Sequence, residues 1–193
     1  IASPENVSVS DKNEQALKNI NEKYGVKVTL DNKETADKAD VLFLCVKPQF
    51  LYGVIDEIKN SVSDNTVIVS IVAGQAIETI EKAFEHNIKL VRVMPNTPAL
   101  VGEGMAALTP NSNVTKEETD VVVNVFNSFG KGEVVSENLM DAVTAVSGSS
   151  PAYVFMMIEA MADAAVIGGM PRSQAYTFAA QAVLGSAKMV LET

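Results

Sequence analysis

Two short segments of this sequence carry residues that could hold a ligand, and each follows an apolar run. The pair Lys47-Pro48 comes directly after residues 41–46, and the pair Ala73-Gly74 comes directly after residues 67–72. A lysine offers a cation to anionic groups, and small residues let a flat ring approach the backbone. If both runs are parallel strands, the two segments meet at the carboxyl edge of a sheet, where open α/β folds bind ligands. The same residues also fit plain roles, as a solvated lysine, a strand terminator and tight packing.

The available side chains exclude several classes of chemistry. With one cysteine, Cys45, and one histidine, His86, the sequence contains neither a disulfide framework nor a Cys/His zinc site. We expect Cys45, within an apolar strand, to be a small buried hydrophobe. Glu159 and Asp163 share a helix face, but two carboxylates alone make a poor metal site, so no metal is expected.

The composition and net charge limit the kinds of partner that the protein could bind. The 193 residues are 47% hydrophobic, enough for a packed core. A formal net charge of -9 argues against a protein that wraps nucleic acid, because that task needs clustered Lys and Arg. The most apolar region, residues 143–170, is interrupted by acidic residues and glycines, so we expect no membrane span. With a single cysteine in the sequence, a cytoplasmic location is expected.

The elements that must position the two segments follow from the pattern of apolar residues. Short apolar runs alternate with helical stretches through the first half of the chain, at residues 26–30, 33–39, 41–46, 50–60, 67–72, 77–84 and 90–94. Several of these runs are apolar almost throughout, as in strands covered by helices on both faces. The pattern predicts a Rossmann-type, doubly wound, mostly parallel sheet.

After Ser136 the pattern becomes helical, with helices predicted at residues 137–146, 152–167 and 172–191. We therefore divide the chain into a dinucleotide-binding domain, residues 1–135, and the first part of a helical domain, residues 136–193. The last helix has no charge between Arg172 and Lys188, and such a helix needs burial on nearly all sides. Further helices after residue 193, a partner subunit, or both must therefore cover it, and for the intact protein we predict a homodimer or a multiple of dimers.

The expected glycine signature of a dinucleotide fold, G-x-G-x-x-G, does not occur. We expect residues 1–3 to be the end of the second strand, with the first strand and its glycine turn, roughly thirty residues, upstream. An alternative register makes residues 7–10 that strand.

Five segments, in this order and spacing, resemble pyrroline-5-carboxylate reductase. They are Asp40-Val-Leu-Phe-Leu-Cys-Val-Lys-Pro-Gln49, Arg92-Val-Met-Pro-Asn-Thr-Pro98, Gly102-Glu-Gly-Met105, Asp141-Ala-Val-Thr-Ala-Val-Ser-Gly-Ser-Ser-Pro-Ala-Tyr153 and the helical part that includes Gly169-Met-Pro-Arg172. The resemblance covers nearly the whole chain, except residues 5–21. It implies an oxidoreductase that reduces 1-pyrroline-5-carboxylate to L-proline with NAD(P)H, the last step of proline biosynthesis.

The resemblance also assigns cofactor contacts. It places the dinucleotide along the turns after two strands and Asn32 at its adenosine part, although Asn32 equally fits a helix cap. The implied cofactor-binding residues are Ser3, Asn32, Cys45, Val46, Lys47, Pro48, Ile71, Val72 and Ala73.

The choice between NADP and NAD depends on the residue that ends the second strand. A carboxylate there accepts from the ribose 2′-OH and repels a 2′-phosphate. With Ser3 at that position, and Lys12 and Asn13 nearby as donors, NADPH is preferred. The alternative register places Asp11 there and favours NADH.

For the substrate, the resemblance implies Glu137, which also fits a simple role as a helix-dipole partner. It places the proton-donating and carboxylate-binding loop beyond Thr193, so we leave the catalytic groups unassigned and expect residues 1–193 alone to be inactive. Two other classes stay open. One is a β-hydroxyacid-type dehydrogenase, which would use Lys188, and the other is a non-catalytic dinucleotide-binding protein.

Overall fold

The computed structural model describes residues 2–193, which form two compact units, one up to Thr144 and the other Ala145–Thr193. The division lies later than the expected boundary after residue 135. The reason is local packing, because Met140 is 1% exposed and the carboxylate of Glu137 binds Arg92, which is also in the first unit. Residues 136–144 therefore belong structurally with the first unit.

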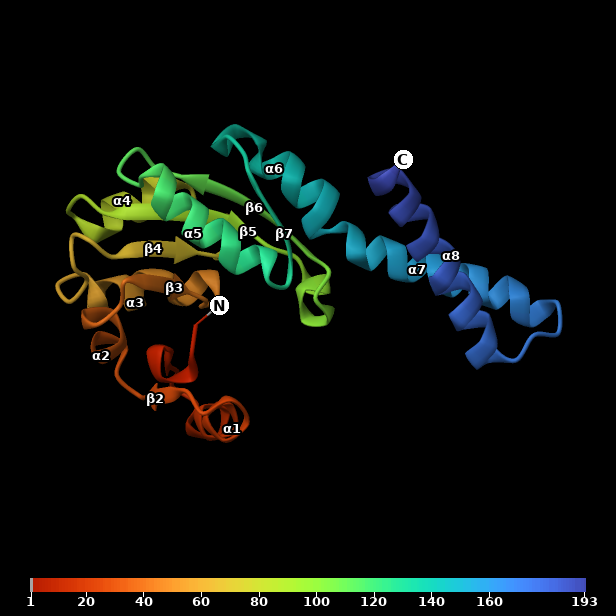
Figure 1. Ribbon diagram of the computed structural model, residues 1–193, viewed down its shortest axis with the longest axis horizontal. Coiled ribbons are helices and arrows are strands. Elements are labelled where there is room, and N and C mark those ends of the chain that lie inside the picture. The colour runs from red at the N-terminus through yellow and green to blue at the C-terminus, as the bar shows by residue number, and fades with distance from the viewer. Residues whose placement is uncertain (1) are drawn as a thin grey trace. The chain divides into compact units, whose positions relative to one another are not determined.

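Seven strands form two sheets within residues 2–193 (Figure 1). β1 (Ser8–Ser10) and β2 (Lys27–Thr29) form a parallel pair. The larger sheet has the order β3-β4-β5-β6-β7, parallel except between β5 and β6. Its strands are β3 (Val41–Leu44), β4 (Val67–Ser70), β5 (Lys89–Met94), β6 (Gly104–Pro110) and β7 (Gly130–Val134). The predicted α/β fold with a mostly parallel sheet is confirmed.

The first of these strands lies later than expected. Ser3 directly precedes a 3₁₀ helix, η1 (Pro4–Asn6), and the strand is Ser8–Ser10. The placement of a strand end at residues 1–3 is therefore wrong, and the alternative register holds. Ile1 lies outside the described residues. Proline at the first helical position favours a helical turn over a strand, which explains the difference. Asp11 now follows the carboxyl end of β1.

A helix connects β1 to β2 within the smaller sheet, and a second helix connects β2 to β3 of the larger sheet. α1 (Glu14–Tyr24), which the sequence pattern did not predict, begins where the Asn13 side chain accepts from the Ala16 N–H and ends at Gly25 with φ of 68°. α2 (Asn32–Asp37) follows β2, and its fully buried Ala36 joins the core of the larger sheet. In the described part of the chain β1 pairs only with β2, and β3 pairs only with β4.

Helices cover both faces of the five-stranded sheet, as predicted. α3 (Leu51–Ile58) and α4 (Ile77–Phe84) pack their apolar sides on one face, and α5 (Lys116–Asn127) lies across the other (Figure 1). All four residues of β4 are buried, because successive side chains enter the cores on opposite faces. The strand ends are thereby held on a rigid sheet.

The helical part begins irregularly. The single helix expected at residues 137–146 is instead η4 (Glu137–Leu139), α6 (Met140–Val143) and a π-helical turn, Thr144–Gly148. The second unit contains α7 (Ser150–Ile167) and α8 (Arg172–Glu192), which pack through three buried alanines, Ala162, Ala175 and Ala179. Small residues allow these two helices to approach closely.

One stretch of the described chain, Glu137–Ile167, is long and apolar enough to cross a membrane by length and composition, with a mean hydropathy of 1.3. A single stretch of this kind is weak evidence, and this one contains four acidic residues. The absence of a membrane span stays a prediction.

Candidate functional site

The turn after β3 carries the first group of predicted cofactor residues. Cys45 follows the strand directly, Lys47 stands at the N-cap of η2 (Pro48–Phe50), and Pro48 is its first residue. Cys45, Lys47 and Pro48 are exposed, and Val46 is half-buried. The exposed turn therefore presents backbone and side chains at the carboxyl edge of the sheet.

Cys45 is more accessible than expected, because the residue is exposed rather than buried. Its thiol nevertheless lies close enough to surrounding protein atoms that desolvation raises the pKa of Cys45. A raised pKa leaves little thiolate, so the thiol is a poor nucleophile.

The turn after β4 lies beside the turn after β3. The Ile71 N–H donates to the Leu44 carbonyl across 3.2 Å, which joins the two strand ends. Val72 is buried, Ala73 is exposed, and Gly74 has φ of 73° with no heavy atom within 4 Å of the place where a Cβ would stand. The expectation that the two segments meet at one edge is confirmed, and open backbone at Gly74 fits the approach of a flat ring.

Asn32 lies at the carboxyl end of β2, as the first residue of α2. The helix cap is Asp31, whose carboxylate accepts from the Lys33 N–H at 2.9 Å, so the capping role considered for Asn32 is wrong. The Asn32 side-chain amide donates instead to Glu57 on α3 at 2.8 Å. Lys12 also approaches Glu57, with 3.6 Å between Nζ and Oε1.

Ser3 does not join this group at a strand end. Its hydroxyl donates to the Glu5 carboxylate at 2.7 Å, and both side chains are exposed. Asp11 takes the position after β1, where its carboxylate accepts from the Asn13 N–H at 2.8 Å. The polar groups at the end of β1 are therefore Asp11 and Lys12.

A hydrogen bond to the next strand, β6, holds the turn after β5. The Asn96 side-chain oxygen accepts from the Met105 N–H at 2.8 Å, and residues Thr97–Val101 form the 3₁₀ helix η3. This contact gives Asn96 a role in forming the turn. The turn lies beside the ends of β3 and β4 at the same edge, because β5 runs parallel to β4.

Glu137 forms two hydrogen bonds, to Ile77 and Arg92, that were not predicted from the sequence. Its Oε1 accepts from the Ile77 N–H at 2.8 Å and from Arg92 Nη1 at 2.9 Å. Arg92 is one of two arginines in the chain and interrupts an apolar strand run, which is the signal that could have identified it. A charge at such a position requires a partner.

The remaining candidates have simpler surroundings. Asp163 pairs with Arg172, and the described residues contain no group of three side chains suited to a metal ion. Lys188, which a β-hydroxyacid-type dehydrogenase would use, pairs on the surface of α8 with Glu192 at 3.6 Å. A hollow of about 310 Å³ lies at the amino end of β5, lined by Asp64, His86, Asn87, Ile88, Lys89 and Asn113, at the edge opposite the turns.

Comparisons with known proteins agree with this arrangement. Residues 137–193 match the family model for pyrroline-5-carboxylate reductase dimerisation, and residues 1–74 match the model for NADP oxidoreductase, coenzyme F420-dependent. The pyrroline-5-carboxylate reductase of Escherichia coli is 52% identical over 90% of this chain and 65% of the relative, so the chain spans about two thirds of that protein. The reductase of Methanosarcina acetivorans is 45% identical over 100% of this chain and 72% of the relative.

Solved structures show the same likeness. A pyrroline-5-carboxylate reductase from Coxiella burnetii is 35% identical, with a TM-score of 0.93 over 98% of this chain and 71% of that chain. The Plasmodium falciparum pyrroline carboxylate reductase, solved with NADP bound, is 33% identical with a TM-score of 0.88 over 98% of this chain and 70% of that chain.

Proposed function

The chain belongs to the pyrroline-5-carboxylate reductase family, and we propose that the protein is a cytoplasmic enzyme that reduces 1-pyrroline-5-carboxylate to L-proline with NAD(P)H, the last step of proline biosynthesis. The observation that carries this proposal is the 45% identity to the Methanosarcina acetivorans reductase over the whole of this chain. The adjoining turns at the carboxyl ends of β3 and β4 support it, because dinucleotides bind at that edge of such sheets.

In this proposal the cofactor lies along the turns Cys45–Pro48 and Ile71–Ala73, with Asn32 near its adenosine part. NADPH is the proposed cofactor, supported by the NADP bound to the Plasmodium falciparum relative and by the NADP oxidoreductase model. NADH is the alternative, because Asp11 follows β1 and could accept from a ribose 2′-OH. Ser3 does not end a strand, so the argument for its contact with the cofactor no longer applies.

A bound reduced nicotinamide supplies the hydride for an imine carbon. The part of this chain is to position the ring, and the open backbone at Gly74 beside the exposed Ala73 allows close approach. Lys47 is exposed near the same edge and offers a cation to anionic groups of the cofactor or the substrate. The resemblance gives Glu137 a place at the substrate, and its two hydrogen bonds suggest a different role, argued below.

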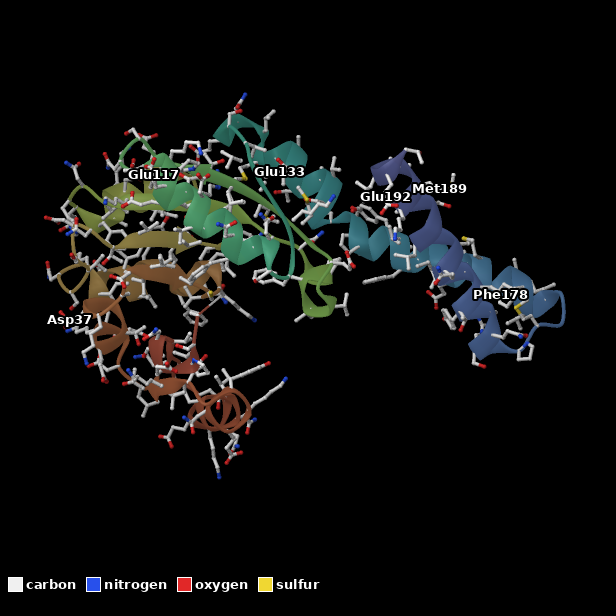
Figure 2. The ribbon with its side chains drawn as sticks, viewed as in Figure 1. Asp37, Glu117, Glu133, Phe178, Met189 and Glu192 are labelled. Atoms are coloured by element: carbon white, nitrogen blue, oxygen red, sulfur yellow. The ribbon has the colours of Figure 1, made fainter. Side chains whose placement is uncertain are left out.

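We also propose that a second copy of the chain covers α7 and α8. The two helices expose large apolar side chains around much of their circumference, which would be unfavourable in water. Phe178 is 61% exposed and Met189 is 65% exposed (both labelled in Figure 2). The match to a dimerisation model over residues 137–193 supports a homodimer or a multiple of dimers.

The test uses the full-length protein with 1-pyrroline-5-carboxylate and either NADPH or NADH. Consumption of the reduced cofactor together with formation of L-proline would support the proposal. Dinucleotide binding without turnover would favour a non-catalytic binding protein. Oxidation of β-hydroxy acids with NADP⁺, without imine reduction, would favour the β-hydroxyacid-type dehydrogenase instead.

A further inference from the structure

The carboxylate of Glu137 joins two elements that flank the turn after β4. Oε1 accepts from the backbone N–H of Ile77, sixty residues away, and from Arg92 on β5. The Arg92 side chain is 15% exposed and that of Glu137 is 36% exposed. A charge-assisted pair this sheltered holds its geometry better than an ion pair on the open surface.

The bond to Ile77 caps a helix. α4 begins after Ala76, which offers no capping side chain, so the first amides of the helix need another acceptor. Glu137 supplies that acceptor from a distant part of the chain, in place of a local Ser, Thr, Asp or Asn. The beginning of α4 is therefore fixed from outside the helix.

The bond to Arg92 fixes the other side. Arg92 pairs in register with Ser70, the last residue of β4, so its side chain starts level with the end of that strand. Glu137 thus bridges the strand beside β4 and the helix that follows β4. The turn between them, residues 71–76, includes the exposed Ala73 and the open backbone at Gly74.

A third contact holds the same turn from the side of α3. The Tyr52 hydroxyl donates to the Gln75 side chain at 2.7 Å. This bond is exposed, whereas the bonds of Glu137 are partly buried. Glu137 therefore provides the more sheltered of the two restraints on the turn.

We propose that Glu137 is a positioning residue for the nicotinamide end of the bound dinucleotide, which it serves by fixing the turn of residues 71–76 between Arg92 and the start of α4. The inference rests on the proposed function. It differs from the role implied by the resemblance, in which Glu137 contacts the substrate. Both hydrogen bonds to Oε1 come from the protein itself, which argues for support of the turn.

The experiment measures NADPH binding by fluorescence titration without substrate, and steady-state kinetics with 1-pyrroline-5-carboxylate, on the full-length protein. Glu137→Ala should weaken NADPH about tenfold, because the amide and the guanidinium lose their acceptor together. Glu137→Gln keeps an oxygen acceptor and should lose less than about threefold. In both variants the KM for the imine, at saturating NADPH, should stay within about twofold of the wild type.

Two fragments of the cofactor locate the effect. Reduced nicotinamide mononucleotide should bind Glu137→Ala more weakly, while 2′-phospho-ADP-ribose should bind it as it binds the wild type. If Glu137→Ala does not fold, Glu137→Asp replaces it, because a side chain one methylene shorter cannot reach both groups without strain. The aspartate variant should show the same selective loss of nicotinamide affinity.

Glu118→Ala is the matched control. Like Glu137, Glu118 is a partly buried carboxylate that pairs with a cation of β5, but its partner, Lys89, lies at the amino end of that strand. Glu118 binds Lys89 at 2.6 Å. This variant should lower the melting temperature and leave NADPH affinity unchanged. Wild-type NADPH affinity in Glu137→Ala or Glu137→Asp, or equal loss of both cofactor fragments, would overturn the proposal.

A raised imine KM in Glu137→Gln, with NADPH binding intact, would also overturn it and return Glu137 to the substrate. Failure of the proposed function has a separate signature. In that case the wild-type protein itself would not reduce the imine, whether or not it binds NADPH.

Discussion

The side-chain amide of Asn32 donates to the carboxylate of Glu57 across 2.8 Å, linking the start of α2 to α3. The same carboxylate lies 3.6 Å from the ammonium group of Lys12, which follows β1. Glu57 is 29% exposed, whereas Lys12 is 74% exposed. One acidic residue therefore organises the polar groups at the carboxyl ends of both strands of the smaller sheet.

If Asn32 faces the adenosine part of the cofactor, its anchor matters for affinity. Asn32→Ala and Glu57→Ala should each weaken NADPH about three- to tenfold, since the first removes the amide and the second releases it. Lys12→Ala should weaken NADPH but spare NADH, because only NADPH carries a 2′-phosphate. Fluorescence titration with both cofactors measures this, and wild-type affinities in the first two variants would place the adenosine elsewhere.

Gly130 and Gly104 are register partners in the β6–β7 pair and approach too closely for a side chain. A Cβ on Gly130 would lie 2.0 Å from the Gly104 carbonyl oxygen. Gly130→Ala should therefore reduce the free energy of unfolding by about 3 kcal/mol or more, as measured by urea denaturation.

Gly53 provides the control for that substitution. It lies in α3 with no heavy atom within 4 Å of a Cβ position, so Gly53→Ala should raise the free energy of unfolding by about 0.5–1 kcal/mol. A Gly130→Ala protein as stable as the wild type would mean that the strands are farther apart than described.

Glu85 is the one described residue other than glycine with a positive φ, 61°. Its carboxylate lies 3.1 Å from Lys59, so a substitution changes both the backbone and an ion pair. Glu85→Gly and Glu85→Ala lose the same ion pair, and only glycine relieves the backbone. The glycine variant should be more stable by about 1 kcal/mol in thermal or urea unfolding. Equal stabilities would show that the left-handed conformation is relaxed in solution.

Glu118 gives the fold a dependence on pH. Its hydrogen bond with Lys89, followed by that with the Thr115 backbone, lowers the pKa of Glu118. A lowered folded-state pKa means that the ionised group stabilises the fold above its unfolded pKa, about 4.3, and that this stability is lost as the pH falls through the lower folded value. Glu118→Gln should remove part of the acid sensitivity of urea unfolding between about pH 5 and pH 3.

The adjacent carboxylate, Glu117, labelled in Figure 2, serves as the control for that measurement. Glu117→Gln lies outside the capping box formed by Thr115 and Glu118, so it should leave the acid dependence close to that of the wild type. Identical pH profiles for wild type and Glu118→Gln would contradict the assignment.

Within the larger sheet, β3 and β4 were predictable because their residues are apolar almost throughout, as in strands covered by helices on both faces. β4 is the clearest case, with every residue buried, and the adjacency of the turns after β3 and β4 follows from parallel pairing alone. β1 was harder to place, because it is three residues long and two of them are serine. Local pattern cannot distinguish such a strand from a loop.

The partners of the site residues were not predictable from spacing. Glu57 lies 25 residues from Asn32, and Glu137 lies 45 residues from Arg92, so no helical or strand period relates them. Such pairs form only once the sheet has brought their elements together. The cap of α2 shows the same limit at short range, because Asp31 and Asn32 are both good capping residues and only the backbone decides between them.

Because the strands form two separate sheets, the smaller sheet and the larger sheet should differ in how well their amide hydrogens are protected from exchange with solvent. The β1–β2 pair contributes no backbone hydrogen bond to the larger sheet in the described structure, and α2 ties the two together through Ala36 and the Asn32–Glu57 contact. The amide hydrogens of β1 and β2 should therefore exchange with solvent through a local opening. Those of β4 should exchange only when the whole domain unfolds. A dinucleotide that binds across the strand ends of both sheets would slow amide exchange in the smaller sheet. Exchange in β1 and β2 would therefore report cofactor binding.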